Sequence, residues 1–387
     1  MTTLLTPATL AELAEAMRAH PRVLAIGART KPRLSQVPDD VALISTRGLR
    51  GIIEYEPDEF TFTALAGTSV REIAQALAEK GQYLPFDPMW LEAGATLGGT
   101  VAAGVSGPGR FRFGGVRDFI LGVRFIDGLG RLLRMGGKVV KNCAGFDLPK
   151  FFVGSLGRFG VLADVTFKVF PSPASRLTSK LLTSGAEAAA KVLMDAANSR
   201  WELDALDLLP DGKTVCLRLA GPASALETIS REVLARWPGQ PISAADADAA
   251  WSELREFRWA HAGGALVKVA ITPAIVPSLD AAARSLDGTR VHFSAGGNVA
   301  FVSLPCSVPA AALQERLCAL CLPAVSLSGN APLWWGPRTT SAISAAVKQA
   351  LDPQGRFPEL QEPEQRSLLR GNCQTGTVSA TTPECSE

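Results

Sequence analysis

A stretch dense in glycine is the part of this sequence whose residue types most clearly suggest chemistry. Residues 94–160 hold 17 of the 36 glycines, where average usage gives about five. Glycine is used where φ must be positive or where backbone must come close to a ligand. Val, Leu, Ile and Phe are interleaved throughout, so the stretch is neither collagen-like nor of low complexity. The pattern predicts either a turn-rich β region or backbone loops that surround a large polyanionic cofactor.

These glycines do not follow the common nucleotide-binding motifs. A dinucleotide needs backbone N–H groups around its pyrophosphate, and a Rossmann domain supplies them with GxGxxG after its first strand. The first predicted strand lacks that motif, and Gly154, Gly157 and Gly160 are spaced as GxxGxxG. The sequence also lacks a P-loop. Any nucleotide is therefore held by a different scaffold.

Residues that bind metals are scattered along the chain. The three histidines are far apart, and the seven cysteines form a single CxxC, Cys318 with Cys321, at the end of an apolar helix. These spacings fit neither a zinc site nor an iron–sulfur cluster, so we expect no metal and interpret the CxxC as a pair of core thiols. An odd, dispersed set of cysteines is typical of reduced cytosolic thiols.

The composition is that of an ordinary globular protein. The 387 residues allow about two domains, and 47% of them are hydrophobic while 20% are charged. A net charge of +2 gives no general attraction to nucleic acid or anionic membranes. The chain has neither an apolar run of transmembrane length nor a signal-peptide pattern at its start. We expect a cytoplasmic protein with no nucleic-acid partner and no transmembrane segment.

Helices and strands alternate over the first 80 or so residues. A helix is predicted to start at Thr6 and to end at Pro21, and Ser69 with Glu72 forms a capping box for a second helix. Strands are predicted over residues 22–27, 41–46, 51–56 and 61–67. A further strand over 160–173 ends in two prolines, which mark the best domain boundary.

The second half alternates strand-like and helical runs, which indicates an antiparallel α+β domain. Helices are predicted over 187–198, from a capping box at Ser224 and Glu227, and over 309–320 and 340–351. The polar tail is predicted to be disordered. The expected division is a first domain over 1–173, a second over 174–361 and a tail over 362–387.

Three blocks of the sequence resemble the vanillyl-alcohol oxidase, or PCMH, type of FAD-binding flavoproteins. They are AIGARTKPRLS (25–35), PFDPMWLEAGATLGGTVAAGVSGPGRFRFGGVRDFILG (85–122) and KVVKNCAGFDLPKFFVGSLGRFGVLADVTFKVFP (138–171). Within this type, the chain is similar to the FAD-binding E subunits of bacterial glycolate oxidases. The resemblance implies an α+β fold, with a two-lobed PCMH-type domain that holds FAD between its lobes and an antiparallel α+β substrate or cap domain after it.

The resemblance also implies which residues surround the cofactor. A loop would wrap the pyrophosphate, a glycine-rich run would pass the ribityl chain and the flavin, and a second lobe would close the site. These residues are Gly27, Ala28, Arg29, Thr30, Lys31, Pro85, Gly94, Thr96, Gly98, Gly99, Thr100, Gly104, Ser106, Gly107, Asn142, Gly145, Gly157 and Val161. Many relatives have glycines and a flavin-linked histidine in the first loop. Here Ala28, Arg29 and Thr30 replace those glycines and no histidine is near, so we expect non-covalent FAD.

Oxidation of a 2-hydroxy acid needs a base for the hydroxyl proton and a cation for the carboxylate. In two-lobed relatives the second domain provides both. The candidates are His292 as the base and Arg258 and Lys268 as the cations, with His261 and Arg218 as further options. A hydrogen-bonded structural histidine and ordinary surface charges are the alternatives for these residues.

We expect an FAD-dependent oxidoreductase subunit that acts on the CH–OH group of a 2-hydroxy acid such as glycolate. The resemblance implies a second flavin subunit and an iron–sulfur subunit as partners, and through them a place at the inner membrane. Two alternatives stay open at this point. One is an FAD-bearing assembly or electron-relay subunit without turnover, which the scarcity of histidines favours, and the other is a polyol or aldonolactone oxidase.

Overall fold

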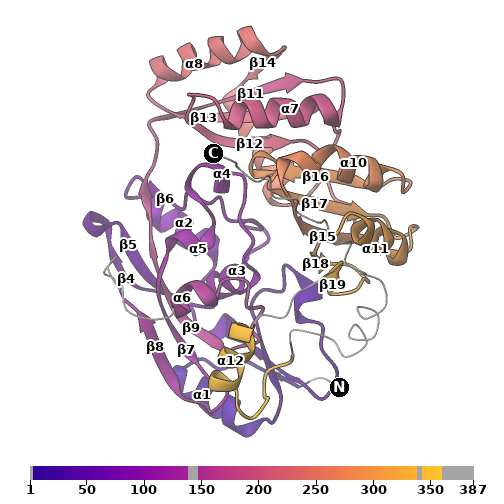
Figure 1. Ribbon diagram of the computed structural model, residues 1–387. Coiled ribbons are helices and arrows are strands. Elements are labelled where there is room, and N and C mark those ends of the chain that lie inside the picture. Colours follow the sequence, from indigo (N-terminus) through magenta and orange to yellow (C-terminus); the bar gives the residue numbers. More distant parts are fainter. Residues whose placement is uncertain (1–2, 138–146, 338–341, 360–387) are drawn as a thin grey trace, which may run out of the picture.

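The computed structural model describes residues 3–137, 147–337 and 342–359. Its sheets divide between the two halves of the chain. Three smaller sheets belong to the amino-terminal half, and one sheet of nine strands belongs to the rest. In Figure 1 the first half is the indigo-to-magenta body below, and the nine-stranded sheet with its helices lies above and to the right of it.

Two lobes make up the first half, as expected for this fold. The smaller lobe is a parallel sheet in the order β1–β3–β2, packed against helix α1. The larger lobe is an antiparallel sheet in the order β4–β5–β9–β7–β8. Their elements are β1 (Leu4–Leu5), α1 (Leu10–Ala19), β2 (Val23–Ile26), β3 (Ala42–Ser45), β4 (Ile52–Glu56), β5 (Thr61–Leu65), β7 (Ile120–Ile126), β8 (Leu132–Gly136) and β9 (Val161–Lys168).

Short helices and a two-stranded pair complete this half. They are α2 (Val70–Ala78), β6 (Gln82–Tyr83), α3 (Leu97–Ala103), α4 (Arg110–Phe113), α5 (Val116–Phe119), α6 (Leu148–Phe151) and β10 (Phe170–Pro171), which pairs with β6. The glycine-rich stretch is thus partly helical, since α3 reads LGGTVAA. Thr96 caps α3 by accepting a hydrogen bond from the N–H of Gly99, and Gly104 ends it with φ of 60°.

The second half is an antiparallel sheet in the order β14–β11–β13–β12–β16–β17–β15–β18–β19. Its strands are β11 (Ser175–Leu182), β12 (Leu203–Leu208), β13 (Thr214–Gly221), β14 (Gly239–Ile242), β15 (Ala265–Ala270), β16 (Arg290–Ser294), β17 (Val299–Leu304), β18 (Ala324–Ser328) and β19 (Trp334–Trp335). Its helices are α7 (Ala186–Ala197), α8 (Ala223–Arg236), α9 (Ala244–Arg255), α10 (Val276–Arg284) and α11 (Ala310–Ala319). Helices α7, α8, α10 and α11 supply side chains to the core on one face of this sheet.

The other face of the nine-stranded sheet packs against α9 and against the first half of the chain. One continuous apolar cluster contains Trp251 and Leu254 of α9, Phe301 of β17, and Met89 and Trp90 from the first half. Every residue of β12 and β17 is therefore buried, because both faces of these strands are covered.

Several element boundaries differ from the sequence-based prediction. Helix α1 is capped by Thr9, whose Oγ1 accepts from Glu12 N at 3.1 Å, three residues later than the predicted start. Helix α8 begins after Pro222, so the capping box predicted at Ser224 is wrong. Ser224 already lies in the first turn of α8. Pro222 takes the N-cap position instead, because the fixed φ of proline suits the start of a helix.

The CxxC also differs from its interpretation. Cys318 and Cys321 are both exposed at the end of α11, and they are not core thiols. The apolar stripe of this helix buries Leu313 and Leu317 instead.

The end of the described chain returns to the first half. Helix α12 (Ala342–Leu351) places Leu351 in the core of the five-stranded lobe, and Phe357 joins the core of the smaller lobe. The carbonyl of Arg356 accepts from Val23 N at 2.9 Å. The division at residue 173 stays a prediction, and these contacts add a carboxyl-terminal segment that stabilises the amino-terminal half. Among the residues that the structure describes, every helix falls short of the length and apolarity that a membrane span requires.

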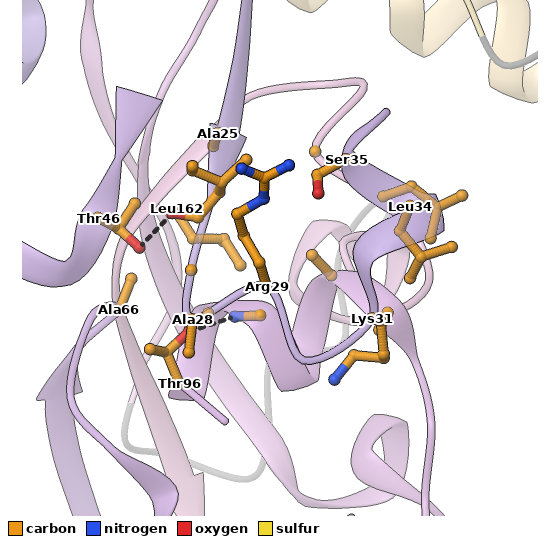
Figure 2. A pocket seen from close by; sticks show the side chains of 18 of the residues that line it. Ala25, Ala28, Arg29, Lys31, Leu34, Ser35, Thr46, Ala66, Thr96 and Leu162 are labelled. Atoms are coloured by element: carbon orange, nitrogen blue, oxygen red, sulfur yellow. Dashed lines mark hydrogen bonds between the residues drawn. The ribbon is translucent and has the colours of Figure 1, made fainter. Parts of the chain in front are cut away.

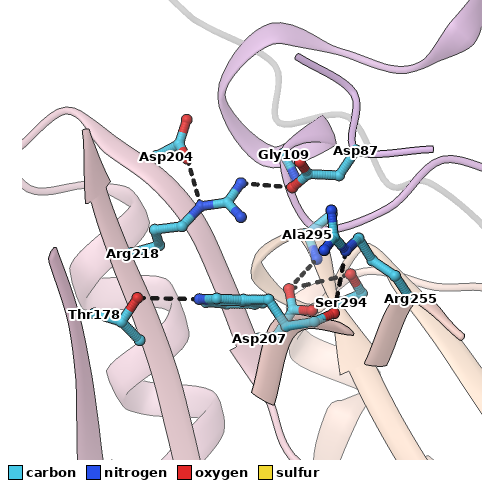
Figure 3. Close-up of polar contacts among 10 residues, drawn as sticks. Asp87, Gly109, Thr178, Asp204, Asp207, Arg218, Arg255, Ser294 and Ala295 are labelled. Atoms are coloured by element: carbon cyan, nitrogen blue, oxygen red, sulfur yellow. Dashed lines mark hydrogen bonds and ion pairs between the residues drawn. The ribbon is translucent and has the colours of Figure 1, made fainter. Parts of the chain in front are cut away.

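A buried ionic network joins the two halves (Figure 3). Arg218 of β13 pairs with Asp204 of β12 and with Asp87 of the first half, and all three side chains are less than a tenth exposed. Asp87 also accepts from Gly109 N at 2.8 Å. Burial alone would raise the pKa of Asp87, but the positive charges of Arg218 and Arg255 outweigh it and hold this pKa below its ordinary value. The guanidinium of Arg218 is therefore shared by two buried carboxylates, and the charge of Arg255 adds to its effect at Asp87.

The substitution Arg218→Met tests this network. It leaves both carboxylates buried without their cation, and we expect it to cost about 3–5 kcal/mol of unfolding free energy at neutral pH. In the wild type, Asp87 has a lowered pKa, so its contribution is present above its unfolded pKa of about 3.9 and fades as the pH falls below that value. In the variant the same carboxyl has a raised pKa and gains stability on protonation. The deficit should shrink from pH 7 towards pH 4.

Urea denaturation of the full chain at several pH values measures this deficit. The matched control is Arg236→Met, which breaks an exposed pair with Asp195 and should cost under about 1 kcal/mol at any pH. A deficit for Arg218→Met that stays constant across this pH range would contradict the account.

Candidate functional site

A pocket opens between the two lobes of the first half (Figure 2). It contains about 740 Å³ of space free of atoms, counting the part open to solvent. The loop over residues 27–31 that follows β2 forms one wall, helix α3 forms another, and the turn over 155–162 closes the site. These segments are distant in sequence, so only the packing of the lobes brings them together.

Two glycines allow α3 to lie this close to its neighbours. A Cβ atom on Gly27 would be 2.1 Å from Thr96 Oγ1, and one on Gly98 would be 2.8 Å from the Cβ of Ala66. Both distances are too short for any side chain. The glycines at these two positions are therefore required by close packing.

The loop after β2 presents unused backbone donors to the pocket. Among the described residues, the N–H groups of Ala28, Arg29, Thr30 and Lys31 find no acceptor in the backbone or in a side chain. Buried or half-buried N–H groups are nearly always paired in proteins. A row of free donors at a pocket wall therefore fits an anionic ligand such as a pyrophosphate.

Two cationic side chains border the same wall. Arg29 has φ of 55°, the left-handed conformation that glycine usually adopts, and its guanidinium lies at the pocket in Figure 2. Lys31 is 8% exposed, and its Nζ lies 4.5 Å from the centre of the Trp90 ring. Burial lowers the pKa of Lys31 to about 8. A bound phosphate would reverse that shift by pairing with the ammonium group.

Nine of the residues predicted around the cofactor line this pocket. They are Gly27, Ala28, Arg29, Thr30, Lys31, Thr96, Gly98, Gly99 and Gly157. Non-covalent attachment of the cofactor stays a prediction. The lining residues that the structure describes include no histidine or cysteine. Asn142 and Gly145 lie outside the described residues.

The other predicted residues lie nearby but do not line the pocket. Val161 is fully buried in the core of the smaller lobe, since its neighbour Leu162 points into the pocket and adjacent residues of a strand face opposite ways. Thr100 is buried in α3, and Gly104 ends this helix. Gly94 forms a turn with φ of 80°.

Pro85, Ser106 and Gly107 form a separate junction of two backbone segments. The N–H of Gly107 donates to the carbonyls of Phe86 and Asp87, and Ser106 Oγ accepts from Val116 N at 3.0 Å. Gly109 also lies against this junction. A Cβ atom added at Gly109 would be 2.2 Å from the carbonyl oxygen of Pro85.

Ser155 is a pocket residue that the sequence analysis missed. It is 4% exposed, lines the pocket, and its Oγ has no hydrogen-bond partner among the described atoms. A buried hydroxyl without a partner costs free energy, and a ligand oxygen in the pocket would supply one. Its position in the sequence GSLG, between Gly154 and Gly157, is the feature that could have indicated a pocket residue.

Two of the proposed catalytic side chains are engaged in structural contacts. His292 is fully buried, and its Nε2 lies 2.8 Å from Asp207 Oδ2. Asp207 also accepts from Ser294 Oγ and from Ala295 N. Arg258 pairs with Glu92 at the surface. These positions support the alternatives of a structural histidine and a surface charge.

Lys268 lies where the two halves meet. Its Nζ donates to the carbonyl of Gly104, at the end of α3, over 2.9 Å. Burial, followed by the positive charge of Arg110, lowers the pKa of Lys268 to about 8. Among the described residues, neither cation has a carboxylate partner. The remaining options are also committed, because His261 bonds to the carbonyl of Gly288 and Arg218 belongs to the ionic network.

Comparisons with known proteins identify the first half. Residues 2–136 match the family model described as FAD binding domain. Glycolate oxidase subunit GlcE of Escherichia coli (strain K12) is 38% identical over 216 residues, which are 55% of this chain and 58% of that protein. Glycolate oxidase subunit GlcD of Bacillus subtilis (strain 168) is 31% identical over 37% of this chain and 30% of that protein.

More distant matches extend this picture. D-lactate dehydrogenase of Anaerostipes hadrus is 29% identical over 34% of this chain and 28% of that protein. A solved structure of alkyldihydroxyacetonephosphate synthase aligns with a TM-score of 0.66 over 91% of this chain and 76% of that one, at 13% identity, which shows a shared fold. The chain covers less than two thirds of the length of each of the three curated relatives. The resemblance to PCMH-type FAD flavoproteins is confirmed, and FAD is the cofactor.

The substitution Gly27→Ala tests the pocket. The added Cβ must displace Thr96 from its capping position on α3, which moves the helix away from the loop. We expect the affinity for FAD to fall by about tenfold or more, which corresponds to about 1.4 kcal/mol. The FAD content of the purified chain and titration of the FAD-free protein measure the loss. The control is Gly137→Ala, whose Cβ would meet none of the described atoms within 4 Å. Equal FAD affinity in both variants would contradict the assignment of this pocket.

Proposed function

Because residues 2–136 of this chain are an FAD-binding domain of the PCMH type, we propose that the protein is an FAD-dependent oxidoreductase subunit that oxidises the CH–OH group of a 2-hydroxy acid. The observation that carries this proposal is the row of free backbone donors between Gly27 and Lys31, together with similarity to glycolate oxidase and D-lactate dehydrogenase sequences. Glycolate is the substrate we propose first.

The chain's own groups would hold the cofactor without a covalent bond. The N–H groups of the loop over 27–31 would bind the pyrophosphate, and Arg29 and Lys31 would balance its charge. Ser155 would donate its hydroxyl to a cofactor oxygen. When bound, FAD would accept the hydride that leaves the substrate carbon, and this hydride carries both electrons of the oxidation.

The substrate carboxylate would bind between Lys268 and Arg110. Two neighbouring cations that have no ion-pair partner among the described residues repel each other, and a bound anion relieves both this repulsion and the desolvation of Lys268. Lys268 extends from β15 of the second half and Arg110 from α4 of the first half. A carboxylate between them would therefore contact both halves at the loop that carries Gly104 and Ser106.

Partners would receive the electrons. The chain resembles two proteins that are both named as glycolate oxidase subunits, which supports a complex with a second flavin subunit. We extend this proposal to an iron–sulfur subunit and to a cytoplasmic complex that is peripheral to the inner membrane through its partners.

A non-catalytic electron-relay or assembly subunit is the second candidate. It is favoured by one specific observation, the engagement of His292 and Arg258 in structural contacts, which leaves few free groups for proton transfer. In that case FAD would serve the stability of the complex or the passage of electrons.

Anaerobic mixing with substrate separates these candidates. We expect the flavin absorbance of the purified, FAD-loaded chain to bleach on addition of glycolate or D-lactate, since the isolated subunit carries the substrate site. Bleaching by a polyol such as xylitol, but not by either acid, would show a polyol or aldonolactone oxidase instead. A spectrum that no substrate changes, in a chain with stoichiometric FAD, would support the relay subunit and sink the proposed activity.

The substitution Lys268→Met tests the carboxylate site. We expect KM to rise by about tenfold or more with a smaller change in kcat, because a charge-assisted hydrogen bond is lost. In the wild type the ammonium is charged below its pKa of about 8, so KM should rise as the pH passes above that value. Lys268→Arg keeps the charge and should restore part of the affinity at high pH. A kcat that increases above pH 8, with KM unchanged, would instead identify Lys268 as a base.

A further inference from the structure

A second pocket lies in the carboxyl-terminal half, and it is not part of the cofactor site. It contains about 1020 Å³ of space free of atoms, counting the part open to solvent. Strand β11, the turn after β12, helix α9 and the start of β16 all border it. Its walls include the apolar side chains of Leu209, Ala250 and Leu254, and charged groups of both signs surround them.

One wall carries a buried donor with no acceptor. Trp259 lines the pocket and is 5% exposed, and its Nε1–H has no hydrogen-bond partner among the described atoms. Its ring packs edge-on against His292, and its backbone carbonyl accepts from Arg290 Nη1 at 2.7 Å. An unpaired buried N–H costs about 1–3 kcal/mol, so an acceptor at this wall would be stabilising.

Some charged groups at the pocket are already committed to the fold. Arg284 pairs with Asp280 at 2.8 Å and donates to the carbonyl of Pro210. Asp211 accepts from the backbone N–H groups of Lys213 and Thr214 and from the hydroxyl of Thr214. Neither residue is available to a ligand without a loss elsewhere.

The uncommitted groups have opposite signs. Within the described part of the chain, Lys180 and Glu253 have no ion-pair partner at this pocket, and Arg290 has guanidinium N–H groups beyond the one that binds Trp259. Three donors and one carboxylate therefore surround an apolar surface. A plain anion would face the charge of Glu253, and a plain cation would face Lys180 and Arg290.

We propose that this pocket binds a small zwitterionic α-amino acid with an apolar side chain. The ligand carboxylate would accept from Trp259 Nε1, Arg290 and Lys180. Its ammonium group would pair with Glu253, and its side chain would contact Leu209 and Leu254. This arrangement satisfies every uncommitted group at the pocket and compensates both signs of charge.

The site is separate from the cofactor pocket. Three aromatic side chains in contact lie between them: the rings of Trp259 and Phe257 are tilted with centres 6.1 Å apart, and those of Phe257 and Trp90 are stacked with centres 4.4 Å apart. Trp90 in turn contacts Lys31 at the cofactor pocket. Binding can therefore be measured without turnover, and its outcome does not depend on the proposed oxidation.

Ligand-observed fluorine NMR on the FAD-loaded full chain tests the proposal with three matched probes. They are 4-fluorophenylalanine, which is zwitterionic, 3-(4-fluorophenyl)propionate, which lacks the ammonium group, and 4-fluorophenethylamine, which lacks the carboxylate. We expect the zwitterion to bind at least about fivefold more tightly than either analogue. Equal or tighter binding of an analogue, or no binding of any probe, would overturn the assignment.

Substitutions locate the binding. Glu253→Gln, at an exposed position, should weaken 4-fluorophenylalanine by about tenfold and leave the propionate unchanged or tighter. Trp259→Phe removes the N–H and replaces the indole with a smaller aromatic ring, and it should weaken both of these probes. The control Arg231→Gln lies on α8, away from the pocket, and should change neither. If Glu253→Gln affects both probes equally, the zwitterion does not bind in the proposed orientation.

Discussion

The close approach of helix α3 to the loop after β2 is the constraint on which the functional part of this molecule depends. Gly27 lies against Thr96, and Gly98 lies against Ala66, at distances that exclude any Cβ atom. This contact holds the free N–H groups of the loop opposite the start of a helix that is itself capped by Thr96. The glycines are therefore structural elements of a binding wall, and their abundance reflects close packing of backbone as much as turn formation.

Interactions between the halves fix the other side of the site. The apolar cluster around Trp90, Trp251 and Phe301 contains residues of both halves, and the Arg218 network selects one relative position, because its carboxylates come from both halves. Buried ion pairs add little net stability but penalise alternative arrangements strongly. The combination gives a defined junction next to α3, where Lys268 reaches the carbonyl of Gly104.

Uncompensated positive charge recurs at the places where ligands are proposed. Lys31 at the cofactor pocket and Lys268 at the junction both have a pKa lowered to about 8 by burial. A protein keeps a desolvated ammonium group at a cost, which a bound anion offsets. The unfavourable desolvation of these two ammonium groups is therefore already present in the ligand-free fold, and binding of a phosphate or a carboxylate would relieve it.

The sequence by itself determined the cofactor loop, the glycine-rich run and the α+β character of both halves, because these depend on short-range backbone requirements that appear as ordered motifs. It predicted that Gly27, Gly98 and Gly157 lie around one cofactor, and the structure places all three at one pocket. Tertiary structure alone decided which side chains are free. His292 and Asp207 are 85 residues apart, and Lys268 and Gly104 are 164 residues apart. Such pairs are set by the packing of whole sheets, and no local pattern encodes whether a side chain ends in a core, in an ion pair or at a pocket.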